Sequence, residues 1–437
     1  MPELFLTIFF ISILLFFLGS GIWVAISMIG VSSIGMLIFT SRPVGDAMAT
    51  TIWGTSSSWT LTALPLFVWM GEILFRTKLS ENLFKGLAPW MSRLPGGLVH
   101  VNVVGCALFA AISGSSAATV ATVGKMSIPE LRKRNYPEKL LLGSLAGSGT
   151  LGLLIPPSII LIIYGVTVQE SIAKLFVAGI IPGIMIAIIF MLYVIIWSII
   201  NRKEMPTFSD KFSFIEKIKG SRQLLPVIIL IAAVIGSIYT GIATATEAAS
   251  LGVVGALVLS FFQKTLNKET FKLSLMGATK TSCMIAFILA GSSFLSLAMG
   301  FTGLPRNLAV WIQEMNLSPY LLILVLTIFY IILGMFLDGI SAVVLTMAII
   351  EPMIRQAGFD MIWFGIFLVI VVEMAQITPP VGFNLFVLQG MANKDMGFIA
   401  RSAFPLFILM VLAVILIIVF PNIALWLPEQ MVQNISK

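Results

Sequence analysis

The sequence predicts an all-α polytopic membrane protein, built as an inverted-topology repeat with two re-entrant helical hairpins and two broken helices. Its 437 residues are 59% apolar and only 10% charged, and a mean hydropathy of +1.06 excludes a chain of soluble domains. At about 20 residues per spanning helix, the chain supplies about a dozen hydrophobic segments. Glycine and proline interrupt these segments at corresponding places in the two halves, which is typical of secondary transporters.

The composition excludes several other classes of protein. Cys106 and Cys283 both lie in apolar segments and His100 is the only histidine, so neither a disulfide framework nor a metal cluster is expected. The chain has no Walker-type phosphate loop and is not powered by ATP. His100 is about 20 Å along a helix from Ser113, too far for a catalytic dyad, so no enzyme is predicted. The net charge of +7 comes from short loops and indicates topology rather than nucleic-acid binding.

The hydrophobic segments can be placed along the chain in order. Residues 4–40 are long enough for two helices and are divided at Gly19–Gly21. This stretch lacks a basic start and a small-residue cleavage site, so we do not expect a removable signal peptide. The further segments are predicted at residues 61–74, 99–126, 140–164, 175–200, 224–262, 281–299, 319–350, 361–388 and 404–425.

Basic residues predict which loops face the cytoplasm, because short cytoplasmic loops retain lysine and arginine. The loop after Met126 and the stretches 201–222 and 263–280 are rich in both, so we expect them on the cytoplasmic side. Residues 165–174 and 351–360 carry one cation each and are expected on the other side.

Two segments are predicted to re-enter the membrane as hairpins from opposite sides. Residues 99–126 lie between two cytoplasmic regions and have Ser113–Ser116 at their middle, whereas residues 319–350 have Asp338–Ser341 at theirs. A non-helical turn at membrane depth is tolerated only inside protein or beside water. We therefore expect the two tips to point at each other across the bilayer.

The two halves repeat at a spacing close to half the chain. The tip Gly114–Ala117 matches Gly339–Ala342, and the proline pair Pro156–Pro157 matches Pro379–Pro380. The first repeat is predicted over residues 1–222, with scaffold helices, an interfacial arm helix at 79–92, a hairpin at 98–128 and a broken helix at 140–165. The second covers residues 223–437, with scaffold helices, an arm helix at 303–317, a hairpin at 319–352 and a broken helix at 361–390.

The first half carries candidate binding residues at its tip and at its helix break. The hydroxyls and free carbonyls of Ser113–Ser116 suit a cation, and the N–H groups that begin the next helix suit an anion. The alternative is that these small residues only allow close packing. The proline pair interrupts the second helix, so that carbonyls near Gly152 and Ile155 are free for sodium and Ser158 is placed to donate to a substrate. A plain kink without a ligand is the alternative.

The second half is more polar. Thr378, just before its proline pair, is the expected ion ligand. Asp338 at the tip is expected to bind a cation, to accept a hydrogen bond from a substrate hydroxyl, or only to cap the following helix. Glu373 is an ionisable group within a span, which is functional by default, although a partner chain is an alternative source of its neutralising charge.

Three strings of residues resemble the large membrane subunit of the tripartite ATP-independent periplasmic (TRAP) transporters. They are Phe336–Gly339, Ile377–Val387 and Gly149–Ser158, and the resemblance runs nearly end to end. It implies an elevator-type, sodium-driven importer of carboxylate-bearing solutes in the bacterial inner membrane, whose mobile part consists of the two hairpins and two broken helices. It also implies two partners, a small membrane subunit of four helices and a soluble periplasmic binding protein. No cofactor is expected besides Na⁺ as the coupling ion.

The resemblance also implies which residues bind. Those assigned to sodium are Ser113, Gly114, Ser116, Gly152, Ile155 and Pro156 in the first half, and Gly339, Ser341 and Thr378 in the second. Those assigned to substrate are Ser115, Ser116, Ser158, Asp338 and Asn384. The string Leu61–Phe67 favours the sialic acid branch of the family over the branches for C4-dicarboxylates or sugar-derived acids. A passive channel is the remote alternative, and it would never accumulate a solute uphill.

Overall fold

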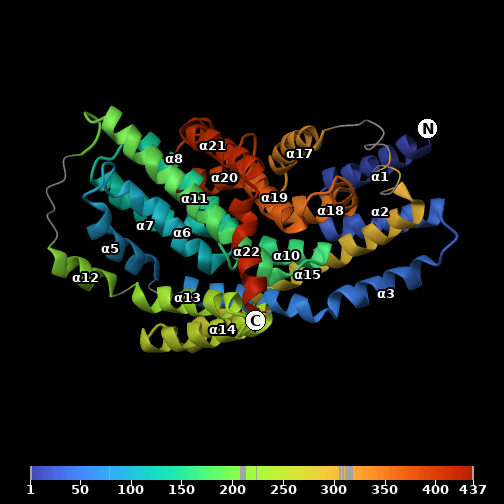
Figure 1. Cartoon of the computed structure of the whole chain (residues 1–437), viewed down its shortest axis with the longest axis horizontal. Coiled ribbons are helices and arrows are strands. Elements are labelled where there is room, and N and C mark those ends of the chain that lie inside the picture. The colour runs from blue at the N-terminus through green and yellow to red at the C-terminus, as the bar shows by residue number, and fades with distance from the viewer. Residues whose placement is uncertain are drawn as a thin grey trace.

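The protein is helical throughout the part of the chain that the structure describes. The computed structural model describes residues 2–77, 79–206, 213–222, 224–304, 307, 310 and 318–435, and these ranges contain no β-strand. Helices satisfy their own backbone hydrogen bonds, as hydrocarbon requires. In Figure 1 the two halves interleave, because α20 lies beside α7 and α21 beside α8.

The first half contains peripheral helices, then a hairpin, a broken helix and one long helix. Leu83 and Leu87, one turn apart, bury the apolar face of the short amphipathic helix α5. The elements are α1 (Pro2–Gly19), α2 (Val24–Phe39), α3 (Val44–Ser56), η1 (Trp59–Thr62), α4 (Ala63–Phe75), α5 (Leu79–Met91), the hairpin α6 (Val99–Ser113) and α7 (Ser116–Lys133), the broken helix α8 (Glu138–Gly149), α9 (Leu151–Leu154) and α10 (Ile159–Val168), then α11 (Ile172–Ile200) and α12 (Phe214–Ser221).

The second half follows the same order. The predicted arm helix at 303–317 lies almost wholly outside the described residues. The elements are α13 (Leu225–Tyr239), α14 (Ala245–Phe262), α15 (Lys268–Thr302), the hairpin α17 (Pro319–Gly334) and α18 (Gly339–Gln356), the broken helix α19 (Met361–Ala375) and α20 (Phe383–Ala392), then α21 (Met396–Val419) and α22 (Asn422–Ile435).

Two predicted boundaries are wrong, and each error has a local cause. The apolar stretch 224–262 is two helices, because Gly241 has a φ of +73° and Thr244 caps α14 in a capping box with Glu247. The segment predicted at 281–299 begins earlier, because α15 starts at Lys268, within the lysine-rich stretch 263–280. The Asn267 side chain accepts from the Thr270 N–H at 2.7 Å and starts the helix there.

Few helices are long enough to cross a membrane unbroken. Five of the described helices meet that length and apolar content, or seven if two bent pairs are each one span. The bent pairs are α3 with η1–α4, at 53°, and α8–α9 with α10, at 40°. Most of the remaining apolar helices have 10–17 residues and belong to hairpins or breaks. Hydropathy alone counts these short helices as well, and it therefore predicts about a dozen segments.

Two arginines tie each half of the chain to the other in the same way. Arg132, in the last turn of α7, donates to the Ala392 carbonyl at the end of α20 at 2.7 Å. Arg355, in the last turn of α18, donates to the Val168 carbonyl at the end of α10 at 2.8 Å. A helix C-terminus favours a cation, because its last carbonyls are unpaired. The hairpin of each half is thus bonded to the broken helix of the other half.

The broken helices form the centre of the molecule, and α13 and α14 form its edge. Every residue of α19, from Met361 to Ala375, is buried. By contrast, α13 and α14 expose large apolar side chains such as Ile229 and Phe262, which suits a surface in contact with lipid or with another membrane chain.

Candidate functional site

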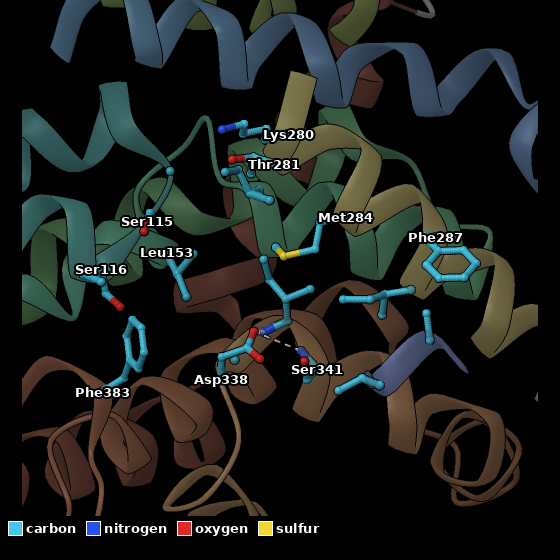
Figure 2. A pocket seen from close by; sticks show the side chains of 18 of the residues that line it. Ser115, Ser116, Leu153, Lys280, Thr281, Met284, Phe287, Asp338, Ser341 and Phe383 are labelled. Carbon is cyan, nitrogen blue, oxygen red and sulfur yellow. Dashed lines mark hydrogen bonds between the residues drawn. The ribbon is translucent and has the colours of Figure 1, made fainter. Parts of the chain in front are cut away.

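A cavity of about 1120 Å³ lies where the two hairpin tips and both helix breaks converge. One wall comes from the tips of α6–α7 and α17–α18 and from residues beside the breaks. The opposite wall comes from the start of α2 and the middle of α15 (Figure 2). The polar residues of the lining are Ser115, Ser116, Lys280, Thr281, Asp338, Ser341 and Gln376.

The first tip is a tight turn made of small residues. Gly114 has a left-handed φ of +56°, a conformation that favours glycine. The Ser115 hydroxyl accepts from the Ala118 N–H at 3.4 Å and caps α7. The Ser113 hydroxyl donates to the Ser115 carbonyl at 3.1 Å. These bonds hold the turn together and leave Ser116, the first residue of α7, in the cavity wall.

The second tip is held by a carboxylate instead. Residues 335–338 separate the two helices, and the Asp338 carboxylate accepts from the N–H groups of Ile340 at 3.1 Å and Ser341 at 3.2 Å. Gly339 lies so close to α19 that a Cβ would meet a side chain of that helix at 3.0 Å. Asp338 therefore does cap α18, and it lines the cavity as well.

The two tips correspond in a register that the sequence did not indicate. The helices after the tips begin at Ser116 and Gly339 and end at Lys133 and Gln356, so their spacing along the chain equals that between the proline pairs. The predicted pairing of Gly114 with Gly339 is therefore wrong by two positions. The capping residues Ser115 and Asp338 are the true equivalents, because a cap fixes where its helix begins.

The break in the first broken helix is capped from within. Ile155 is extended after the end of α9. The Ser158 hydroxyl donates to the Leu153 carbonyl and accepts from the Leu161 N–H. Ser158 is completely buried, so it joins the two pieces of helix and does not face the cavity. The Pro156–Pro157 bond is cis, as is the equivalent bond of the second half.

A glycine brings each hairpin against the broken helix of its own half. A Cβ on Gly152 of α9 would lie 2.6 Å from Ser116 Cα and 2.7 Å from the Ser115 carbonyl oxygen. In the second half, Ala375 occupies the position of Gly152, and the glycine is on the hairpin. There, a Cβ on Gly334 would lie 2.5 Å from the Ala375 Cβ. Both contacts therefore require the absence of a side chain.

The second broken helix offers its polar groups in a different way. The Thr378 hydroxyl donates to the Met374 carbonyl at 2.8 Å, which leaves its lone pairs for a ligand. The Gln376 amide reaches the Leu337 carbonyl at 3.5 Å and so lies between the break and the second tip. The Asn384 N–H donates to the Gln376 carbonyl at 3.1 Å and closes the break.

The structure brings about half of the predicted site residues to the cavity. The residues in its lining are Gly114, Ser115, Ser116, Asp338, Gly339 and Ser341. Gly152 lies directly behind Ser116. The residues that do not line it are Ser113, Ile155, Pro156, Ser158, Thr378 and Asn384. The ion and substrate roles assigned to all of these residues stay predictions.

The wall opposite the tips is not predicted by the sequence patterns. Lys280 and Thr281 of α15 line the cavity with Met284 and Phe287, whereas Lys280 was expected in a cytoplasmic loop. The signal that would have revealed it is the helix cap at Asn267, since a helix that begins there carries Lys280 into the membrane region.

A cavity formed by hairpin tips and helix breaks from both halves of a repeat is the arrangement of a secondary transporter, which binds its substrate and coupling ions at discontinuous helices. The chain belongs to the family described as the DctM component of the tripartite ATP-independent periplasmic transporters, whose sequence model matches residues 10–423.

Relatives with different substrates are similarly close to this chain. It is 32% identical to the C4-dicarboxylate TRAP transporter large permease protein DctM of Pseudomonas aeruginosa, over 90% of this chain and 92% of that one. It is 29% identical to the sialic acid TRAP transporter large permease protein SiaM of Vibrio cholerae, over 94% and 96%. Its fold is similar to that of the YdaH transporter of Alcanivorax borkumensis, with a TM-score of 0.66 at 12% identity over 95% and 97% of the two chains.

Family membership establishes the general role. The chain is a multi-pass permease component of the inner membrane and not an enzyme. It works with a small membrane subunit and a periplasmic binding protein.

Proposed function

We propose that this permease imports a carboxylate-bearing solute, with sialic acid as the first candidate and Na⁺ as the coupling ion. The observation that carries this proposal is the cavity between the two tips, which combines one lysine with hydroxyls from both halves and with the N-terminus of α7. A hydroxylated acid offers a binding partner to each of these groups, through its carboxylate or its hydroxyls.

Lys280 supplies the positive charge that an anionic substrate requires. It is the only basic residue among the described ones that line the cavity, and Figure 2 shows it across from Ser115, Ser116 and Asp338. One ammonium group matches one carboxylate. Sialic acid has one carboxylate and many hydroxyls, whereas a C4-dicarboxylate would bring a second negative charge to a cavity that already contains Asp338.

The helix start at the first tip supports the same substrate class. The N-termini of α7 and α18 meet the cavity at Ser116 and Gly339. The start of α7 carries unpaired N–H groups and a partial positive charge, and is therefore a favourable place for a carboxylate. At the start of α18, by contrast, the Asp338 carboxylate already accepts from Ile340 and Ser341. The hydroxyls of Ser115 and Ser341 beside them suit the substrate's own hydroxyls.

Oxygen atoms at the glycine contacts support sodium binding. Gly152 lies against the Ser115 carbonyl and the start of α7, so a hydroxyl and backbone carbonyls converge there. In the second half, Ser341 lines the cavity at the tip, and the Leu337 carbonyl lies 3.5 Å from the amide of Gln376, two residues before Thr378 in the break. Neutral oxygens are the ligands that hard cations accept. We therefore propose one sodium ion in each half.

The two walls of the cavity support an elevator motion. One wall belongs to the hairpins and broken helices, which the arginines at the ends of α7 and α18 join across the halves. The other wall belongs to α2 and α15, which pack against each other and against α4 and α3. Movement of the first group against the second would carry the substrate across while each group keeps its own packing.

The test is uptake into liposomes that contain this chain and its small subunit, with the binding protein outside. Labelled sialic acid should accumulate only with an inward sodium gradient and with the binding protein present. Labelled succinate, offered through its own binding protein, is the comparison. Accumulation without sodium would contradict the coupling, and accumulation of succinate alone would contradict the substrate.

Import of a C4-dicarboxylate is the second candidate, and one observation favours it. The Pseudomonas aeruginosa relative, named for C4-dicarboxylates, is 32% identical to this chain, slightly more than the sialic acid relative. If succinate accumulates and sialic acid does not, the sodium-coupled mechanism stands and the second sodium must balance the second carboxylate.

A further inference from the structure

A completely buried carboxylate lies behind the first hairpin tip. Glu373 of α19 is 1% exposed, and neither of its oxygens has a hydrogen-bond partner among the described residues. Its polar neighbour is the Ser116 side chain. Because Glu373 is enclosed by its own chain, the predicted alternative of neutralisation by a partner chain is wrong. An unpaired carboxylate at this depth costs several kcal/mol, so it is neutralised either by a bound cation or by a proton.

A buried amide with the same deficiency lies close by. Asn384 at the start of α20 is 0% exposed, and both atoms of its amide lack a partner among the described residues. A Cβ on Gly149 would lie 3.6 Å from the Asn384 amide nitrogen and would also meet Val120. The amide therefore faces the contact between α7 and α8.

The neighbours of these two groups on α7 lie about one helical turn apart. Ser116, beside Glu373, and Val120, beside Gly149 and Asn384, are four residues apart on α7, a separation of roughly 6 Å. The Glu373 and Asn384 side chains make no hydrogen bond with each other, since neither has a partner among the described residues. A cation with oxygen ligands at 2.3–2.6 Å holds two opposite ligands about 5 Å apart, which is comparable to this spacing along α7.

We propose that Glu373, Asn384 and Ser116 bind one Na⁺, in addition to the sodium ions at the two tips. The donors are a carboxylate, an amide oxygen and a hydroxyl, all hard oxygen ligands. One carboxylate balances one monovalent charge. The described residues contain no group of three His, Cys, Asp or Glu that would hold a divalent or transition metal. This inference rests on the proposed sodium-driven import and adds a site to it.

The first half has no counterpart of this site. At the spacing that relates the two proline pairs, Glu373 corresponds to Thr150 and Asn384 to Leu161. The Thr150 hydroxyl donates to the Gly147 carbonyl at 2.6 Å, so that position is neutral and satisfied. The site therefore makes the two halves unequal and links the first hairpin tip to the second broken helix.

The site also gives a physical reason for strict coupling. With Na⁺ bound, the Glu373 region is neutral and can move through the low-dielectric core of the membrane protein. Without Na⁺ it carries a buried negative charge, which opposes that movement. The empty and the loaded forms then differ by one charge at this position.

The first test is Glu373→Gln in liposomes that contain this chain and its small subunit, with the binding protein outside. The neutral amide has the shape of the carboxylate and needs no cation. We expect the Hill coefficient for Na⁺ and the net charge moved per sialic acid each to fall by one. The matched control is Glu72→Gln, which removes a partly exposed carboxylate that pairs with Arg76 at 3.0 Å and should change neither.

A second measurement does not depend on transport. In choline chloride, purified Glu373→Gln should unfold at a higher temperature than the unmodified protein, because it buries no charge. Added NaCl should stabilise the unmodified protein more than the variant. Asn384→Leu, which copies the first half, should keep the charge moved per substrate and raise the Na⁺ concentration for half-maximal uptake about tenfold, the loss of roughly 1.4 kcal/mol.

The outcomes separate this site from the proposed function. If uptake by the unmodified protein needs no Na⁺, sodium coupling fails and this site with it. If the unmodified protein needs Na⁺ and Glu373→Gln keeps the same Hill coefficient, charge per substrate and Na⁺-dependent stability, only the inference about Glu373 is overturned. The inference would also be overturned if uptake by Glu373→Gln became independent of pH while its sodium stoichiometry stayed unchanged. Glu373 would then bind a proton instead of Na⁺.

Discussion

The two hairpin tips do the same task with different chemistry. The first tip caps its helix with the Ser115 hydroxyl, and its neighbouring carboxylate, Glu373, comes from the other half of the chain. The second tip caps its helix with its own carboxylate, Asp338, which faces the cavity. Each tip thus has one carboxylate, buried at the first and exposed at the second. A repeat can keep its geometry while it distributes charge unequally, because a cap needs only an acceptor oxygen.

The largest expected effect comes from the glycine contacts behind the tips. Gly152→Ala and Gly334→Ala should each abolish uptake, since the added Cβ would overlap atoms at 2.6 Å and 2.5 Å and displace a tip. The measurement is sodium-driven uptake at equal amounts of folded complex. Gly300→Ala is the control, because nothing lies within 4 Å of that position.

The same pair of variants also distinguishes the two halves. The atom that opposes Gly334 is the Cβ of Ala375, so the double change Gly334→Ala with Ala375→Gly should restore uptake. Gly152 is opposed by backbone, and no single truncation should rescue Gly152→Ala. If a second change restores uptake to both Gly152→Ala and Gly334→Ala, or to neither, the predicted difference between the two halves is wrong.

The next effect concerns the lysine that faces both tips. Lys280→Gln should raise the KM for sialic acid by about 10- to 100-fold, because a charge-assisted hydrogen bond contributes about 1.5–3 kcal/mol. The Na⁺ concentration for half-maximal uptake should stay unchanged. Lys272→Gln on the same helix, outside the cavity lining, is the control. If Lys280→Gln changes the sodium dependence and leaves the KM for sialic acid unchanged, Lys280 does not bind the substrate.

A smaller effect is expected from the charge at the second tip. Asp338→Asn keeps an oxygen that caps α18 and removes one negative charge. We expect the Na⁺ requirement to rise about fivefold, for a loss of about 1 kcal/mol, with an unchanged melting temperature. If Na⁺ dependence stays the same, Asp338 acts only as a cap.

The smallest effect should come from the cap at the first tip. Ser115→Ala removes the acceptor for the Ala118 N–H and should destabilise the protein by about 1 kcal/mol, measured by thermal unfolding in detergent. Asp338→Ala, which removes the acceptor for two N–H groups, should lower the melting temperature more. The reverse order would show that the two caps are not equivalent.

Local signals explain why much of the fold could be predicted from the sequence. Proline pairs and clustered glycines break helices wherever they occur, so both broken helices and the hairpin at Ser113–Ser116 could be predicted. The start of α15 was missed because lysines obscured it, although the cap at Asn267 is also a local signal. The register of the tips follows the capping residues Ser115 and Asp338, whose side chains differ, and so it cannot be found by matching identical residues.

Side-chain direction explains why the site was predicted only in part. Ser158 and Asn384 both follow a break, but one caps its helix and the other faces the contact between α7 and α8. The direction of the side chains at the start of a short helix depends on the packing around that helix. Periodicity in the sequence does not indicate this direction. Lys280 reaches the cavity from a helix far from either tip in sequence, so only tertiary structure reveals it.

The arginine bonds between the halves also affect how the protein is made. Arg132 depends on a carbonyl 260 residues further along the chain, which a ribosome reaches only after roughly 10–50 s of synthesis. During that time the first hairpin is in the membrane without the helix end that it must bind. Arg355, by contrast, finds its carbonyl 187 residues behind it, already synthesised. The second hairpin can therefore dock as it emerges, and the first reaches its final place only when the chain is almost complete.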